Sequence, residues 1–185
     1  NSKLILFNKL MKKNSKIIYD EEINESKKLK KISDKNNLKK ITIGKKKSKL
    51  KILENKIIKN YQIVKFNYKN KNYFFKTKLI GKIQIKNLIM AILACNESNL
   101  AINKIIKVIE KIKPVQGRLE KIGNLFDKSI VILDFAHTPE ALKSCLLSVR
   151  EHFKFSKISI VFGCGGERDK PKRKIMGKIA NNYCD

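Results

Sequence analysis

The chain has 185 residues, of which 42% are hydrophobic, enough for one large domain or parts of two. Its 43 Lys and Arg residues against 16 Asp and Glu residues give a formal net charge of +27, which raises the question of a nucleic-acid partner. The positive residues are mostly Lys and lie among many Ile and Asn residues, all favoured by an AT-rich coding sequence. We therefore interpret the charge as compositional and expect no specific nucleic-acid partner, since the sequence contains no RNA-binding aromatic motif, helix-turn-helix signature or zinc finger.

The four cysteines are widely spaced and form no C-x-x-C motif. Cys95 and Cys145 fall on apolar faces of predicted helices. This pattern predicts reduced thiols in a cytoplasmic protein, not a disulfide framework or a zinc site. No apolar stretch reaches membrane-spanning length and no signal peptide is evident, so we expect no membrane partner.

The first half of the chain mixes helices and strands. We predict the tail of a helix at residues 3–13, a short strand at 16–20, and a polar surface helix or loop at 21–37. Two short strands follow at 41–43 and 50–53. Apolar and polar residues then alternate from Tyr61 to Tyr68. Residues 69–72 turn the chain before it returns over 73–79, which predicts a hairpin with a four-residue loop.

Two helices follow the hairpin. Asn87 begins a hydrophobic helix that reaches Cys95, and a second helix runs from Ile102 to about Ile112. Pro114 ends the second helix, and residues 115–117 are the expected domain boundary, because the chain alternates strand and helix only after them.

An unbroken apolar run from Ile130 to Leu133 is typical of a strand buried on both faces. Thr138 is then a helix N-cap, with Pro139 and Glu140 in the favoured first positions of the helix. A second apolar run at 158–162 predicts another strand. Two strands joined by a helix should lie parallel with a right-handed crossover, so we predict an α/β fold.

Polar residues follow both predicted strands. Ligands of such sheets bind beyond the carboxyl ends of the strands, where Asp134, His137 and the loop 163–169 would project. The glycines of this loop let its backbone approach a ligand closely, but a tight turn into the helix that begins near Pro171 explains them equally well.

Several groups of residues occur in a fixed order. They are Gly81 with Asn87, Gly117-Arg118-Leu119-Glu120, the segment from Asp134 to Leu142, the segment from Phe162 to Asp169, and Lys172-Arg173 with Met176-Gly177. Together they resemble the Mur ligases, and within that family the UDP-N-acetylmuramoyl-tripeptide synthetases. The resemblance implies that residues 1–115 are the later part of the central ATP-binding domain. Residues 116–185 would be the first half of a Rossmann-like C-terminal domain.

The resemblance also implies an activity. Ligases of this branch use ATP and magnesium to join meso-diaminopimelate or lysine to UDP-N-acetylmuramoyl-L-alanyl-D-glutamate, through an acyl phosphate, during peptidoglycan precursor synthesis. A carboxylate becomes a good acyl donor only when its oxygen is phosphorylated, and magnesium offsets charge repulsion during the transfer. The family further implies a monomer.

Roles follow for four residues of the nucleotide site. Asn87 resembles the asparagine that contacts adenine, although it also suits a helix N-cap. Arg118 and Asp134 resemble the pair that reaches the nucleotide from the C-terminal domain, where Asp can accept ribose hydroxyls and Arg can donate to phosphate or base. The alternative for Arg118 is a surface salt bridge. His137 either lines the same site or is a structural hydrogen-bonding residue.

Two further residues have roles implied by the resemblance. Lys3 resembles the family's carbamoylated lysine, which helps to bind magnesium; the alternative is a surface charge. Arg168 resembles the arginine that binds the carboxylate of the incoming amino acid, for which its bidentate geometry is suited. The alternative for Arg168 is an ion pair with Glu167 or Asp169.

The sequence departs from the family at three positions, where Gln84, Phe135 and Glu167 replace the usual Asn, Tyr and Asp. It also has no G-x-x-x-x-G-K-[ST] phosphate loop, no D-N-P-R motif and no initiating Met. We therefore expect an internal piece of a longer ligase that is inactive alone. The alternatives are another ligase of the superfamily, such as a folylpolyglutamate or cyanophycin synthetase, a basic nucleic-acid-binding protein, and a degenerate gene product.

Overall fold

The computed structural model describes residues 2–44, 48–59, 61–165 and 169–185, with the backbone alone for residues 2 and 3. The chain forms two compact units. The N-terminal unit comprises residues 1–77 and 86–112, and the C-terminal unit comprises residues 78–85 and 113–185. None of the described helices is both long and apolar enough to cross a membrane.

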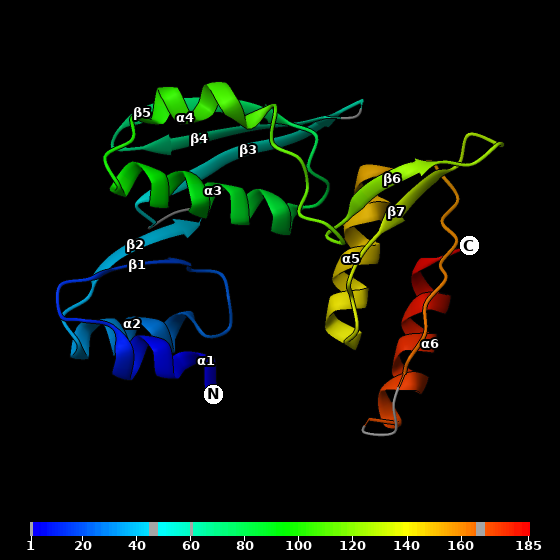
Figure 1. Cartoon of the computed structure of the whole chain (residues 1–185), viewed down its shortest axis with the longest axis horizontal. Coiled ribbons are helices and arrows are strands. Elements are labelled where there is room, and N and C mark those ends of the chain that lie inside the picture. The colour runs from blue at the N-terminus through cyan, green and yellow to red at the C-terminus, as the bar shows by residue number, and fades with distance from the viewer. Residues whose placement is uncertain (1, 45–47, 60, 166–168) are drawn as a thin grey trace. The chain divides into compact units, whose positions relative to one another are not determined.

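A mixed five-stranded sheet of order β1-β2-β3-β4-β5 is the centre of the N-terminal unit (Figure 1). Its strands are β1 (Lys16–Asp20), β2 (Lys39–Gly44), β3 (Leu50–Ile58), β4 (Tyr61–Tyr68) and β5 (Lys71–Thr77). The first three strands are parallel, and β3, β4 and β5 are antiparallel. Helix α2 (Ser26–Lys35) connects β1 to β2 and packs on both.

Alternation along β4 determines which face of the hairpin is buried. Gln62, Val64, Phe66 and Tyr68 are buried, whereas Lys65 between them is exposed. This confirms the predicted strand, because a period of two residues places every second side chain on the same face of a sheet.

The loop of this hairpin is shorter than predicted. Tyr68 pairs with Lys71, so only Lys69 and Asn70 form the turn. Their φ angles of 49° and 61° give a type I′ turn, whose twist matches that of the flanking strands. The prediction of a four-residue loop was wrong because the two-residue turn lets residues 71 and 72 join the ladder.

The start of the chain is helical, as predicted. Helix α1 (Ser2–Ile5) continues into the π-helical turn η1 (Leu6–Leu10). Leu4, Phe7 and Met11 pack against a core that contains Ile17 and Leu29. Leu10, in the same turn, is 69% exposed.

Helix α3 (Lys82–Glu97) begins five residues before the predicted start. Asn87 is therefore an exposed residue inside the helix, and its predicted role as an N-cap is wrong. Gly81, with φ +87°, precedes the helix and provides the turn into it. Helix α4 (Ile102–Ile109) follows and packs on β5.

The C-terminal unit contains a two-stranded antiparallel sheet of β6 (Glu120–Asn124) and β7 (Ile130–Leu133). The strand at 130–133 was predicted, but its burial on both faces was not confirmed, since Ile130 and Leu133 are 37% and 45% exposed. The sequence did not predict β6, which pairs with β7, and the two central residues of β7, Val131 and Ile132, are half-buried.

Two helices complete the C-terminal unit (Figure 1). Helix α5 (Pro139–His152) has the predicted start, because Thr138 Oγ1 accepts a hydrogen bond from the Ala141 N–H at 3.2 Å. Helix α6 (Pro171–Tyr183) also begins at the predicted proline. Their apolar faces meet in a core formed by Leu142, Leu146, Ile158 and Met176.

The segment 158–162 was predicted to be a strand parallel to 130–133, and it is not a strand in the structure. One side of it is nonetheless covered by α5 and α6, since Ile158 is 7% exposed while Val161 is 101% exposed. Its described backbone contacts include an Asp185 N–H bond to the Ile158 carbonyl at 2.9 Å, but it has no strand ladder. An apolar run predicts burial and extension, but a strand also requires a neighbouring strand in register.

Candidate functional site

The loop that contains Arg118 has an unusual backbone. Gly117 and Leu119 on either side of it have φ angles of +67° and +47°. Leu119 is a buried, branched residue for which this left-handed region is uncommon and unfavourable. A conformation of this kind persists only where surrounding interactions enforce it, so other residues must hold this loop in place.

The segment that follows β7 supplies those bonds. The Asp134 carboxylate accepts the Leu119 N–H at 2.9 Å with one oxygen and the Ala136 N–H at 2.9 Å with the other. The Phe135 N–H donates to the Gly117 carbonyl at 2.8 Å. The two segments 117–119 and 134–136 are thus joined by direct hydrogen bonds, which fix Arg118 beside the end of β7.

Two side chains contact the Phe135 ring. The Arg118 guanidinium carbon lies 5.4 Å from the ring centroid, and the His137 ring meets it edge-on with centroids 5.1 Å apart. The His137 Nδ1 also lies 3.1 Å from the Phe135 carbonyl, which can only accept, so Nδ1 is the donor of this hydrogen bond. His137 therefore makes the structural hydrogen bond that the sequence suggested as one of its roles.

This cluster can bind a polar ligand. Arg118, Phe135 and His137 are exposed, and within the part of the chain that the structure describes Arg118 forms no ion pair. The Asp134 carboxylate is only partly buried and has lone pairs beyond the two that accept backbone N–H groups. A guanidinium without an ion pair among the described residues, on a loop that is hydrogen-bonded to Asp134, suits a ligand that combines anionic groups with hydroxyl donors, as a nucleotide does.

Gln84 is a contact that the sequence did not predict. Its side-chain amide donates to the Arg118 carbonyl at 3.1 Å, from the first turn of α3. The sequence signalled this position only as a departure from the family pattern. This hydrogen bond from Gln84 is a third attachment of the loop that contains Arg118.

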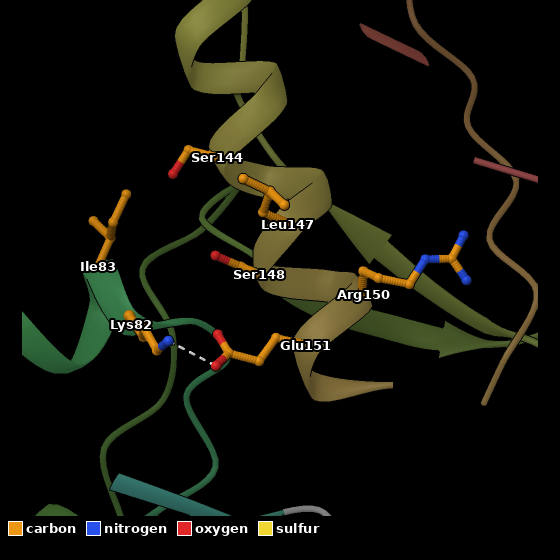
Figure 2. Close-up of a pocket in the computed structure, with 7 residues that line it drawn as sticks. All are labelled: Lys82, Ile83, Ser144, Leu147, Ser148, Arg150 and Glu151. Carbon is orange, nitrogen blue, oxygen red and sulfur yellow. Dashed lines mark ion pairs between the residues drawn. The ribbon is translucent and has the colours of Figure 1, made fainter. Parts of the chain in front are cut away.

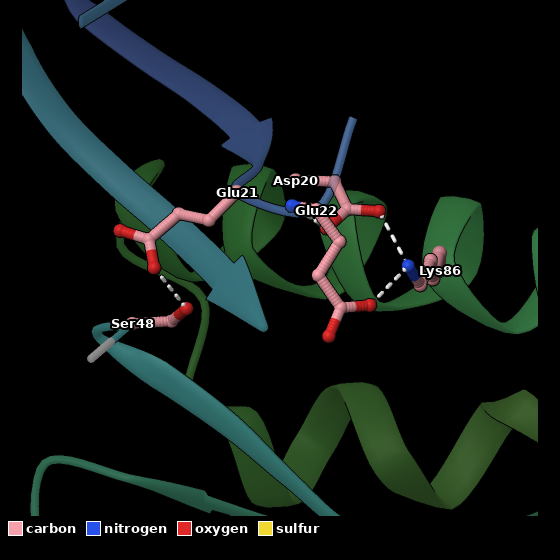
Figure 3. A network of polar contacts seen from close by, with 5 residues as sticks. All are labelled: Asp20, Glu21, Glu22, Ser48 and Lys86. Carbon is pink, nitrogen blue, oxygen red and sulfur yellow. Dashed lines mark hydrogen bonds and ion pairs between the residues drawn. The ribbon is translucent and has the colours of Figure 1, made fainter. Parts of the chain in front are cut away.

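Asn87 belongs to the N-terminal unit, and its neighbour Lys86 holds that part of α3 in place. Lys86 Nζ lies 2.7 Å from Asp20 Oδ2 and 2.7 Å from Glu22 Oε2 (Figure 3). Partial burial lowers the pKa of Lys86, but the bonds to these two carboxylates outweigh it and raise the pKa above its ordinary value. The ion pairs attach α3 to the carboxyl end of β1.

Lys3 lies in α1, and its side chain is outside the described residues. Arg168 and Glu167 are also outside them, so the predicted contact of Arg168 with an amino-acid carboxylate stays a prediction. Asp169, offered as an ion-pair partner of Arg168, is exposed and accepts the Lys172 N–H at 3.4 Å. Within the described ranges, no group of three His, Cys, Asp or Glu side chains could hold a metal ion.

A cavity of about 440 Å³ lies beside α5 in the C-terminal unit (Figure 2). Residues of α5 and of the first turn of α3 line it, and the Lys82–Glu151 ion pair of 2.8 Å crosses its edge. None of the predicted site residues that the structure describes lines this cavity, so it is separate from the cluster around Phe135.

All four cysteines are free thiols, as the sequence predicted. Burial, with the nearby Asp134 carboxylate and Cys184, raises the pKa of the Cys145 thiol to about 12. Cys145 is therefore protonated at neutral pH and has no use as a nucleophile.

Residues 1–95 match the Mur ligase middle domain, and residues 117–185 match the Mur ligase glutamate ligase domain. The chain belongs to the Mur ligase family. The UDP-N-acetylmuramoyl-L-alanyl-D-glutamate–2,6-diaminopimelate ligase of Rickettsia bellii is 36% identical over 185 residues, which are 100% of this chain and 38% of that relative. The ligase of the same name from Buchnera aphidicola is 40% identical over 109 residues, or 59% of this chain and 22% of that relative.

Solved structures agree on the fold. A structure of a UDP-N-acetylmuramoyl-L-alanyl-D-glutamate–2,6-diaminopimelate ligase aligns with a TM-score of 0.67 at 22% identity, covering 100% of this chain and 38% of that one. Folylpolyglutamate synthetase from Lactobacillus casei aligns with a TM-score of 0.72 at 13% identity, covering 95% and 42% of the two chains. The fold is therefore that of Mur ligase middle and C-terminal domains, and the chain spans about 38% of the length of the first relative.

Proposed function

We propose that this chain is part of an ATP-dependent ligase that adds meso-diaminopimelate to UDP-N-acetylmuramoyl-L-alanyl-D-glutamate in peptidoglycan precursor synthesis. The observation that carries the proposal is the cluster of Arg118, Asp134 and His137 at the end of β7. In the Mur ligase arrangement it would contact the nucleotide from the C-terminal domain. Relatives that are 36% identical along the whole chain bear the name of this ligase.

The residues of the cluster would have different tasks. The Arg118 guanidinium would donate to the phosphate or base of the nucleotide, and the free lone pairs of Asp134 would accept ribose hydroxyls. The bound nucleotide would supply the phosphoryl group that turns a carboxylate into an acyl donor. Asn87, on the exposed side of α3, would contact the adenine, and Arg168 would bind the carboxylate of the incoming amino acid.

Other parts of the proposal rest on the family. Lys3, as a carbamate, would assist in binding magnesium. The domain boundary would lie between residues 115 and 116, close to the start of the second matched domain at 117. The four free cysteines suit a reducing cytoplasm, and we propose a monomer.

The proposal is tested by measuring ADP release by the protein encoded by the complete gene. We expect ADP release to require both the UDP-linked dipeptide and diaminopimelate, with lysine a poor substitute. The isolated 185 residues should release no ADP, because their sequence contains no phosphate-binding loop. ADP release with folate and glutamate, or from the isolated chain, would contradict the proposal.

A further inference from the structure

We propose that Phe135 is a positioning residue of the candidate nucleotide site, whose ring holds the Arg118 guanidinium and the His137 imidazole in their working orientation. The inference rests on the proposed function for the identity of the ligand, a nucleotide. It assigns a role to a residue that would not itself react.

The geometry gives the ring two partners of different kinds. The Arg118 guanidinium carbon, 5.4 Å from the ring centroid, is within the range of a cation–π contact. His137 meets the ring edge-on at 5.1 Å, an arrangement that aromatic pairs prefer. Phe135 is 64% exposed, so these contacts, more than burial in a core, account for its place.

The ring can orient its partners because its own backbone is fixed. The Phe135 N–H bonds to the Gly117 carbonyl at 2.8 Å, and the preceding Asp134 carboxylate bonds to the Leu119 N–H at 2.9 Å. Arg118 stands between those two loop residues. Its backbone is held from both sides, and the Phe135 ring restricts the side chain, which otherwise has several rotatable bonds.

The proposal predicts which substitutions preserve the role. Tyr offers the same ring face, and Phe135 is 64% exposed, so Phe135→Tyr should keep both contacts. Leucine is apolar but has no ring, so Phe135→Leu should release the Arg118 side chain. Phe155→Leu is the matched control, because Phe155 is in the same unit and is 102% exposed.

The orientation is measured directly by NMR of the 185-residue chain. In the wild type the Arg118 side-chain protons should be shifted upfield by the ring, and the His137 ring protons displaced from their free values. Both shifts should disappear in Phe135→Leu and persist in Phe135→Tyr and Phe155→Leu. Unshifted Arg118 protons in the wild type, with unchanged circular dichroism in all variants, would overturn the proposal.

The consequence for binding is measured with ADP and the protein of the complete gene. We expect Phe135→Leu to weaken ADP binding by about three- to fivefold, the size of an exposed cation–π contact, and Phe135→Tyr to restore it. Equal affinity of Phe135→Leu and wild type would overturn the role in binding. A wild-type protein that binds no ADP would instead contradict the proposed function, while the NMR shifts would still decide whether Phe135 positions its two partners.

Discussion

At the scale of single residues, two of the predicted site residues, Asp134 and His137, also make hydrogen bonds within the chain. Asp134 accepts two backbone N–H groups, one of which keeps Leu119 in its left-handed conformation. His137 bonds to the Phe135 carbonyl. The surface salt bridge offered as the alternative for Arg118 is not among the ion pairs of the described residues. Substitution of Asp134 would therefore disturb the loop as well as ligand binding. Arg118 is for that reason the better residue for testing binding.

His152 provides a test that depends on pH. It is 8% exposed and its Nδ1 has no hydrogen-bond partner among the described residues. Burial lowers its pKa below the ordinary value, and Glu151 only partly opposes this. As pH falls below about 6.5, His152 becomes protonated in the unfolded chain but stays neutral in the folded chain. The free energy of unfolding therefore falls until the pH passes the pKa of His152 in the folded state.

We expect acidification from pH 7.5 to 5.5 to lower the free energy of unfolding of the C-terminal unit. The loss should be about 1.4 kcal/mol for each unit by which the two pKa values differ. His152→Leu should remove most of this dependence, whereas His137→Gln, at an exposed histidine, should keep it. The measurement is urea unfolding followed through amide signals of α5. An identical pH slope in wild type and His152→Leu would show that other groups cause it.

At the scale of elements, the sequence predicted what local chemistry determines. Thr138 and Pro139 begin α5 as their positions indicated, and alternation from Tyr61 marked β4. It missed what depends on partners distant in the chain. The run at 158–162 lacks a ladder, and β6 forms only because β7 pairs with it.

Gly81 tests the turn into α3. A Cβ at this position would lie 2.8 Å from Ser148 Oγ and 3.0 Å from Leu119 Cδ1, and the φ of +87° disfavours any other residue. We expect Gly81→Ala to destabilise the C-terminal unit by about 2–5 kcal/mol, from backbone strain and overpacking together.

Gly117→Ala is the control for this prediction. Gly117 also has a positive φ, of +67°, but a Cβ there would meet nothing within 4 Å. Gly117→Ala should therefore lower the free energy of unfolding by only about 1–2 kcal/mol, measured by urea unfolding of both variants. Equal losses would mean that the close approach to Ser148 costs nothing.

At the scale of the whole molecule, sequence motifs were a better guide to the family than amino-acid composition. The charge of +27 pointed toward nucleic acid, whereas the ordered motifs from Gly81 to Gly177 indicated the family to which the chain belongs. The sequence also indicated that Arg118, Asp134 and His137 share a site. It could not show that Phe135 lies between two of them, because that contact depends on the turn at Gly117 and Leu119.

The most direct test of this account is the affinity of the protein of the complete gene for ADP, measured by calorimetry with Arg118→Ala. Loss of charge-assisted hydrogen bonds should weaken binding by about ten- to a hundredfold. Lys121→Ala, three residues away at an exposed position, should bind as the wild type does. Unchanged ADP affinity in Arg118→Ala would contradict the claim that the loop at Gly117–Glu120 forms part of the nucleotide site.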